Sequence, residues 1–220
     1  MQLQIQLIKE PENEMEDFTP TTFTNDTERL YRSSSFCHAT YTSDDTIQAR
    51  WDLLSDFVRE TCAIHGRDDS HGHAHMQAVA HQARFIVQKD HIDTTGTLTL
   101  DAITAAWLHD IADHKYDHDG SLQALLDTFG NKHIWNYPEI KTVIKYVSFS
   151  SENKAILAGT PLDYPQILGA YYSQIRDIVS DADKLEALGT IGVHRAIEYT
   201  TQANPSYSRD QVIAAVKKHA

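Results

Sequence analysis

The sequence predicts an all-α protein, a single helical bundle that follows a non-helical N-terminal extension. From Asp45 onward, apolar residues recur at three- and four-residue steps, which is the period of an amphipathic helix. Residues 1–45 are acidic over 11–17 and rich in Thr over 19–27, and such segments favour turns and extended chain. At 220 residues the chain can bury a substantial core without further division. We therefore expect an irregular extension or short β element over residues 1–45 and one helical domain over residues 46–220.

The apolar stripes predict the first helices of this domain in order. They fall at about residues 45–65, 73–89, 100–110, 122–126 and 140–147. The third stripe contains Leu100, Ile103 and Trp107 and continues in register to Asp110. The carboxylate of Asp110 is therefore expected to point where the apolar face points.

The longest predicted break is residues 148–166, a loop that is Ser-rich at its start and contains Pro161 and Pro165. A helical pair is expected from Ile167 to Tyr199, and two glycines in it indicate a tight bend or close helix packing. These glycines are Gly189 and Gly192. A last helix is expected to start at Ser208, with Gln211 completing a capping box.

Composition limits the classes of partner. The net charge of -12 argues against a nucleic-acid polymer or an anionic membrane surface, but a bound cation and a few local Lys or Arg residues can still attract a small phosphorylated substrate. No apolar run reaches the length of about 18 residues that a membrane span needs. Because Cys37 and Cys62 form no metal or redox spacing and no disulfide framework, we expect a reducing, cytoplasmic location. Whether the chain forms a homodimer is left open.

The pair His109-Asp110 ends the strongly apolar run of residues 105–108. An adjacent imidazole and carboxylate can hold a divalent metal if further ligands come from elsewhere in the chain. A carboxylate that continues a buried stripe needs such a cation or a network of donors. The alternative is an ordinary helix end, with His109 interacting with the helix dipole and Asp110 capping the next segment.

Two other segments could supply the remaining ligands. Upstream, His71 and His75 are four residues apart and would share a helix face, and His75 is favoured because it continues the next apolar stripe. His73 would lie on the other side of that helix, at the surface. Downstream, Asp183 lies in an amphipathic helix, whereas Asp181 looks more like a cap or an acceptor behind the ligands. For each of these groups, a solvated surface position is the alternative.

Three blocks of the sequence together resemble the HD-domain metal-dependent phosphohydrolase superfamily and, more narrowly, an uncharacterised bacterial-type subgroup of HD hydrolases. They are residues 71–79 (HGHAHMQAV), 108–116 (LHDIADHKY) and 181–192 (DADKLEALGTIG). The third block is the most specific, and the resemblance covers about residues 48–200. The chain departs from the subgroup at Gly72, where Asp is usual, and at Ala78, where Arg is usual.

The resemblance implies an HD-type helical bundle that holds one divalent metal ion, Mn, Fe, Co, Ni, Zn or Mg. The implied ligands are His75, His109, Asp110 and Asp183. We expect His71 and Asp181 to lie behind these ligands. Asp113 and Lys115 are the expected catalytic groups. The expected substrate contacts are Lys184, Arg195, Ser148 and Ser150.

The activity implied by this set is hydrolysis of a small phosphate ester or anhydride, such as a nucleotide, by metal-activated water. Two rival interpretations are a non-catalytic ligand-sensing or interaction module and a di-iron oxygenase of the HD type. The complete ligand set disfavours the first. The second needs additional late histidines, and none occurs between His133 and Asp183, although His114 and His118 are present.

Overall fold

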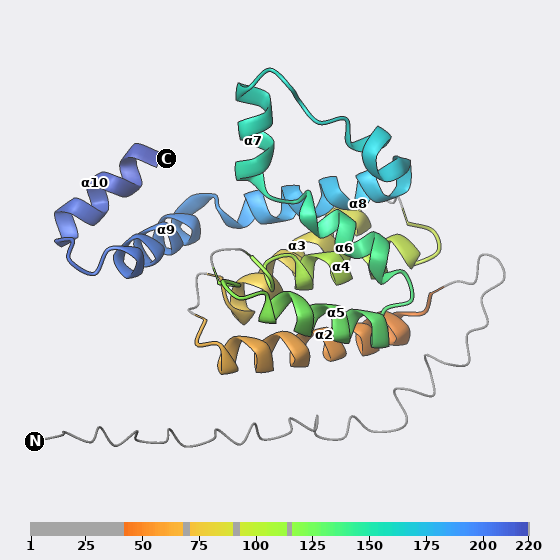
Figure 1. The fold of residues 1–220 in the computed structure, drawn as a ribbon. Helices are drawn as coiled ribbons and strands as arrows, with labels where there is room; N and C mark the ends of the chain where they lie inside the picture. Colours follow the sequence, from red (N-terminus) through yellow and green to blue (C-terminus); the bar gives the residue numbers. More distant parts are fainter. Residues whose placement is uncertain (1–41, 68–70, 90–92, 114–115, 220) are drawn as a thin grey trace, which may run out of the picture. The chain divides into compact units, whose positions relative to one another are not determined.

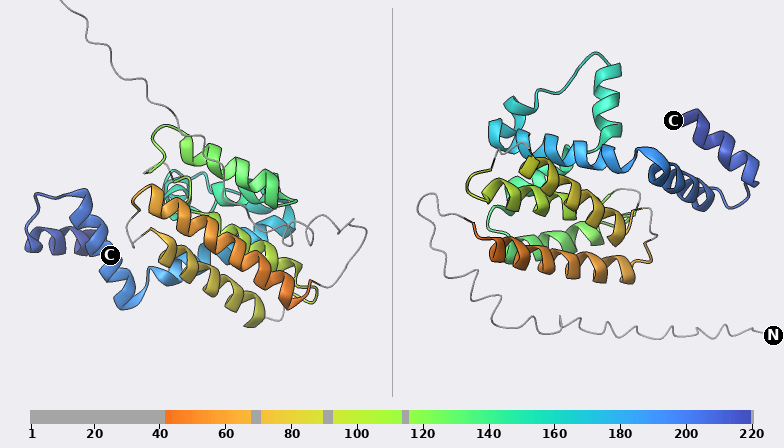
Figure 2. Two further views of the ribbon diagram at one scale, coloured as in Figure 1. Left: turned by 90° about the horizontal axis from the view of Figure 1, so that it is seen from below. Right: turned by 180° about the vertical axis from the view of Figure 1, so that it is seen from behind.

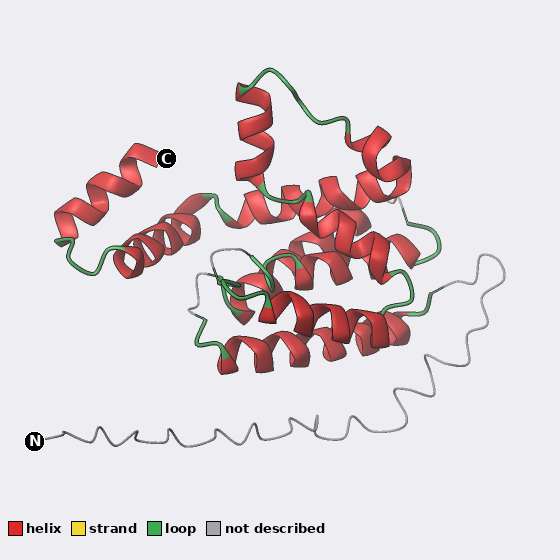
Figure 3. Cartoon of the chain, viewed as in Figure 1, coloured by secondary structure: helices red, strands yellow, loops and turns green. Residues whose placement is uncertain are grey.

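The computed structural model describes residues 42–67, 71–89, 93–113 and 116–219. The chain divides into two units, Met1–Phe36 and Cys37–Ala220, and all described residues belong to the second. Every regular element within these ranges is an α-helix, which confirms the predicted all-α class (Figures 1 and 3). We predicted an irregular extension or short β element over residues 1–45. Residues 1–41 of this segment lie outside the described residues.

Helix α4 (Thr97–Leu108) is the central helix of the bundle. It contacts four others, α2 (Asp44–Ile64), α3 (His73–Lys89), α6 (Tyr137–Lys145) and α8 (Tyr164–Glu186). Both views of Figure 2 show α2, α3 and α4 side by side. Every residue of α4 from Leu98 to Leu108 is buried, so most of its side chains are apolar on every face. Its buried carboxylate, Asp101, accepts hydrogen bonds from Asn136 and Tyr171 at 3.0 Å. The residues that follow α4 therefore leave the helix from within the core.

The starts of α2 and α3 agree with the periodicity to within about one residue. Ser43 caps α2, since its Oγ accepts a hydrogen bond from the backbone N–H of Thr46 at 3.2 Å, and two aspartates occupy the first turn. The predicted stripe of α2 is buried, and its Trp51 packs edge-on against Trp107 of α4 with ring centroids 5.2 Å apart. Helices α2 and α3 both pack against α4. This packing sets the position of the start of α3 relative to the end of α4.

The predicted break at residues 148–166 is wrong, because it contains helix α7 (Phe149–Leu157). Ser148 takes the N-cap position, an acidic residue lies in the first turn, and Gly159 ends the segment with φ 71°. The serines that suggested a loop therefore start a helix. The next helix, α8, begins at Tyr164 because Pro165 fits the first helical turn, where a missing N–H costs nothing.

The two glycines predicted to mark a tight bend or close packing in the C-terminal helical pair show one feature each. Gly189 has φ 71° where α9 (Gly189–Ala203) begins after α8. A Cβ at Gly192 would clash with the carbonyl group of Ala187, so this position packs too closely for a side chain. The chain therefore passes from α8 to α9 through only two residues, Ala187 and Leu188.

The predicted capping box is also present at the start of α10 (Arg209–His219). The N–H of Ser208 donates to Oε1 of Gln211 at 2.8 Å, and the N–H of Gln211 donates to Oγ of Ser208 at 3.3 Å. Helix α5 (Ser121–His133) packs against α6. Across the described ranges, no helix combines the length and the apolar character needed to cross a bilayer.

Candidate metal centre

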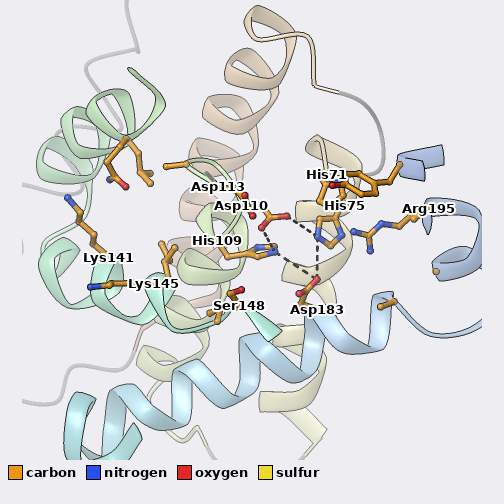
Figure 4. Close-up of a pocket in the computed structure, with 18 of the residues that line it drawn as sticks. His71, His75, His109, Asp110, Asp113, Lys141, Lys145, Ser148, Asp183 and Arg195 are labelled. Atoms are coloured by element: carbon orange, nitrogen blue, oxygen red, sulfur yellow. Dashed lines mark ion pairs between the residues drawn. The ribbon is translucent and has the colours of Figure 1, made fainter. Parts of the chain in front are cut away.

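Four side chains that lie far apart in the sequence converge at one point (Figure 4). His75 comes from the first turn of α3, His109 and Asp110 from the turn that follows α4, and Asp183 from the last turns of α8. Nε2 of His75 lies 3.4 Å from Oδ1 of Asp183 and 3.6 Å from Oδ2 of Asp110. Nε2 of His109 lies 3.6 Å from Oδ1 of Asp110 and 4.0 Å from Oδ1 of Asp183. The set is therefore two imidazoles facing two carboxylates.

These separations fit ligands of one shared cation better than hydrogen bonds. An N–H···O hydrogen bond in proteins is about 2.7–3.2 Å long, shorter than any of the four. Two donor atoms bonded to one metal at about 2.0–2.2 Å and roughly 90–110° apart lie about 3.0–3.5 Å from each other. The 3.4 Å separation falls within this range, the two of 3.6 Å lie just above it, and that of 4.0 Å needs a wider angle at the metal. One ligand atom each from His75, His109 and Asp110 lie within 4.8 Å of one another. Asp183 is not part of this three-residue group, but its Oδ1 approaches both imidazoles from the more open side, with its side chain 30% exposed.

His109 is oriented by the end of its own helix. Its Nδ1 lies 2.7 Å from the carbonyl oxygen of Ala106, and since a carbonyl only accepts, Nδ1 donates the proton. This bond is the contact expected of a histidine at an ordinary helix C-terminus. It also leaves Nε2 with a lone pair that points at the cluster. That Nε2 atom is buried and, among the described residues, has no hydrogen-bond partner. A buried nitrogen in this state costs free energy unless a cation or donor meets it.

The two histidines differ in proton affinity. Burial, helped by the nearby charges of His109 and Arg195, lowers the pKa of His75 to about 2. Burial also acts to lower the pKa of His109, but the carboxylates of Asp110 and Asp183 outweigh it and raise this pKa above its ordinary value. His75 is therefore neutral at neutral pH, as a metal-ligating imidazole must be. His109 faces enough negative charge to attract a cation.

Arg67 holds the backbone of the turn that carries Asp110. Its Nη1 donates to the carbonyl oxygen of Asp110 at 2.6 Å, and its Nη2 donates to that of Ile111. The guanidinium also lies over the ring of Tyr116, 4.5 Å from the ring centroid. A rigid fork with two carbonyl partners fixes the turn more firmly than one bond would. Sequence reasoning missed this arginine, because its partners lie more than 40 residues further along the chain.

The cluster lies in the wall of a cavity of about 760 Å³. This volume is within the range of about 300–1,000 Å³ that is usual for small-molecule sites. Several residues expected near the metal also line it, namely His71, Asp113, Ser148 and Arg195. His71 lies in the turn before α3 rather than on the helix, and its ring packs near those of His75 and Tyr199, with centroids 6.1 and 5.5 Å away. The cavity is thus open to a ligand of nucleotide size beside the four converging side chains.

Three expectations about individual side chains are wrong. Lys184 does not line the cavity, and its Nζ pairs with Glu152 of α7 at 3.1 Å. Asp181 is exposed within α8, because two residues along a helix turn a side chain by about 200° away from Asp183. His73 is partly buried rather than fully solvated, since its Nε2 lies 3.0 Å from Oγ of Ser55 and its ring packs near Trp107.

Two other expected residues cannot be placed. Lys115 lies outside the described residues, as does His114, and the side chain of Ser150 is not described although its backbone is part of α7. Of the histidines considered for a second iron, the two that the structure describes do not line the cavity. His118 is exposed, and His133 packs near Phe129 with centroids 5.0 Å apart.

Sequence reasoning also missed two cations of the cavity wall, Lys141 and Lys145 of α6. Their signal was weak, because lysines on the polar face of an amphipathic helix are ordinarily solvated. Another cation that sequence reasoning missed, Arg176 of α8, does not line the cavity; it is buried and holds α7 in place through an ion pair of 3.0 Å with Glu152. Its Nε also donates to the carbonyl oxygen of Tyr146 at 2.8 Å. This network fixes the junction between α6 and α7, where Ser148 lies.

No protein-family model, no curated protein and no solved structure matches the chain.

Proposed function

We propose that this protein is a metal-dependent phosphohydrolase of the HD type, acting on a small phosphorylated substrate such as a nucleotide. The observation that carries the proposal is the convergence of His75, His109, Asp110 and Asp183, with the buried Nε2 of His109 lacking a hydrogen-bond partner among the described residues. Two imidazoles and two carboxylates suit a divalent transition metal. The sequence resemblance to HD hydrolases, with the same four positions as ligands, supports it independently.

The donor set fits the implied ion. In this proposal His75, His109, Asp110 and Asp183 hold one divalent cation. A cation bound there would polarise a phosphoryl oxygen and lower the pKa of a water molecule. Two imidazoles and two carboxylates leave coordination positions for both.

The remaining groups of the cavity have separate tasks. Asp113 lies in the turn just after Asp110 and lines the cavity, so its carboxylate can accept the proton of the attacking water. Arg195 of α9 approaches the cluster from the side of His75, where it can neutralise charge on the phosphoryl oxygens (Figure 4). Ser148 can donate a hydrogen bond from the opposite wall. Together these groups supply a proton acceptor, a counter-charge and an orienting contact.

We propose a small substrate rather than a polymer because the positive charge is local. The chain carries a net charge of -12, and an extended nucleic-acid backbone ordinarily needs a series of Lys and Arg contacts. Among the described residues, three cations line the cavity, Lys141, Lys145 and Arg195. These suffice for one to three phosphates. The cytoplasmic location expected from the cysteine pattern and the homodimer stay predictions from the sequence.

A phosphate-release screen tests the proposal. The protein would be incubated with Mn²⁺ or Co²⁺ and with nucleoside mono-, di- and triphosphates, alongside single- and double-stranded oligonucleotides. We expect turnover of at least one nucleotide, loss of that turnover on chelation, and no cleavage of oligonucleotides. The Asp110→Ala variant serves as the matched inactive protein. Cleavage of oligonucleotides with every mononucleotide inert would reject the small-substrate proposal, and metal-independent turnover would reject the proposed chemistry.

A further inference from the structure

The cavity is cationic on both sides of the metal-ligand cluster. Figure 4 shows Arg195 on one side of His109 and Asp110, and Lys141 and Lys145 on the other. All three line the same cavity as the ligands. A single phosphoryl group bound at the cluster can be met by Arg195, which leaves the two lysines of α6 available to a further phosphate of the same substrate.

The two lysines form one face of α6. Lys141 and Lys145 are four residues apart, so their side chains project from the same side of the helix. Asp127 of α5 holds the first of them, with its Oδ2 accepting from Nζ of Lys141 at 2.8 Å. The same carboxylate accepts hydrogen bonds from Tyr137 at 2.7 Å and from Gln123 at 2.9 Å. Lys141 is therefore positioned by a network that joins α5 to α6.

Lys145 differs from Lys141, which forms an ion pair with Asp127. It is exposed in the last turn of α6, and its Nζ lies 5.8 Å from the centroid of the Tyr146 ring. In the described part of the chain, no carboxylate forms an ion pair with it. The Lys141–Asp127 pair is neutral, and a divalent cation would balance Asp110 and Asp183. Of the other described charges that line the cavity, Arg195 and Asp113 are one positive and one negative charge and cancel formally. The positive charge of Lys145 is therefore not balanced on the α6 side of the cavity, and it can attract a second anion beside the cluster.

We infer that Lys145, with Lys141 beside it, forms a second anion subsite that binds the phosphate next to the scissile one. The inference rests on the proposed phosphohydrolase function and narrows its substrate to compounds with a phosphoanhydride, namely nucleoside di- or triphosphates. The water oxygen forms a bond to the phosphorus at the cluster, and its proton passes to Asp113. The bond from that phosphorus to the bridging oxygen breaks, and the electron pair leaves with the phosphate held by Lys145. No further reactant is needed.

Binding of two inorganic anions tests this subsite without requiring turnover. Metal content is measured first, and isothermal titration calorimetry then gives the affinities of the Mn²⁺-loaded protein for orthophosphate and pyrophosphate. The wild-type protein should prefer pyrophosphate. The Lys145→Ala variant should weaken pyrophosphate binding by about tenfold, since a charge-assisted contact is lost, and leave orthophosphate and Mn²⁺ binding unchanged. Lys145→Arg should retain the preference, Lys145→Glu should lower it further, and Lys141→Ala should have a smaller effect.

The matched controls are Lys89→Ala on α3 and Lys217→Ala on α10, because both lysines are exposed and neither lines the cavity. They should change neither affinity. If Lys145 only stabilises the end of α6, Lys145→Ala will lower the melting temperature and leave the pyrophosphate preference intact, which overturns the inference. An equal loss of both anions overturns it as well. Failure of the wild-type protein to bind Mn²⁺ would reject the proposed function, and the subsite with it, whereas Mn²⁺ binding without a Lys145 effect rejects the subsite alone.

Discussion

The two ends of α4 both carry an aspartate, but the surroundings of these carboxylates are opposite. At the N-terminal end, Asp93 accepts hydrogen bonds from the backbone N–H groups of Thr95, Gly96 and Thr99 and from the Thr99 hydroxyl, at 2.7 to 3.1 Å. At the C-terminal end, Asp110 faces the imidazoles of His75 and His109 at 3.6 Å, too far for a hydrogen bond.

We propose that the difference separates a structural carboxylate from a metal ligand. The donors around Asp93 satisfy its oxygens and stabilise the first turn of α4, so this end needs nothing further. The other end gathers two carboxylates and two buried imidazole nitrogens whose mutual distances suit a shared cation. A carboxylate's function thus follows from which groups face it, and the variants below test this contrast.

The largest effect is expected at Asp110. Asp110→Ala removes a ligand, so affinity for Mn²⁺ should fall by more than about a hundredfold, since even the groups behind metal ligands are worth about 10–100-fold. Asp93→Ala should leave Mn²⁺ affinity unchanged while lowering stability. Calorimetric titration of both variants measures the contrast. Equal loss of metal in both variants would mean that both substitutions act by unfolding α4 and that Asp110 is not a specific ligand.

Asp113 should separate metal binding from turnover. Asp113→Asn keeps the size of the side chain but removes the proton acceptor, so we expect normal Mn²⁺ content and a kcat lower by about 10²–10⁴-fold. Metal analysis and steady-state kinetics on the same preparation measure both. A variant that loses its metal would place Asp113 among the ligands, and one with full turnover would leave it without a role in the reaction.

Arg67 should have a smaller effect that acts through the position of Asp110. Arg67→Ala removes both hydrogen bonds to the turn and should weaken Mn²⁺ binding by about 10–100-fold. Arg67→Lys should restore only part of the affinity, because an ammonium group lacks the planar fork that reaches both carbonyl groups. If both variants bind Mn²⁺ like the wild type, the turn is held by other contacts.

The smallest effect belongs to Asp93 and depends on pH. Although partial burial acts to raise it, hydrogen bonds from Thr99, Thr95 and Gly96 hold the pKa of Asp93 below its usual range. A depressed pKa in the folded state means that the stabilisation is present above the unfolded-state pKa of about 3.9 and is lost as pH falls through the folded value. Asp93→Ala should therefore cost about 1 kcal/mol near neutral pH and progressively less in acid. Thermal unfolding of both proteins from acid to neutral pH measures this, and a constant difference would contradict it.

Periodicity predicted the parts of this molecule that follow from one helix at a time. The starts of α2 and α3 and the inward direction of His75 and Asp110 could be predicted because each continues a buried stripe. Helix α7 was missed because its serines favour both loops and helix starts.

What could not be predicted depends on tertiary partners. Lys184 was expected to face the substrate, but Glu152 of α7 binds it, and that pairing requires α7 to pack against α8. Lys141 and Lys145 look like solvated surface residues until α6 packs beside the turn that carries His109. Arg67 lies before α3 and acts on carbonyl groups beyond α4. In each case the local pattern identifies the residue type, and packing alone decides its partner.

Anomalous diffraction from crystals grown with Mn²⁺ tests the central claim most directly, because it locates the ion independently of activity. We expect one anomalous peak per chain, within roughly 2.0–2.3 Å of Nε2 of His75 and His109 and of a carboxylate oxygen of Asp110 and Asp183. No peak is expected beside Asp93. A peak elsewhere, or no peak between His109 and Asp183 at saturating Mn²⁺, would contradict the assignment of this cluster as a metal centre.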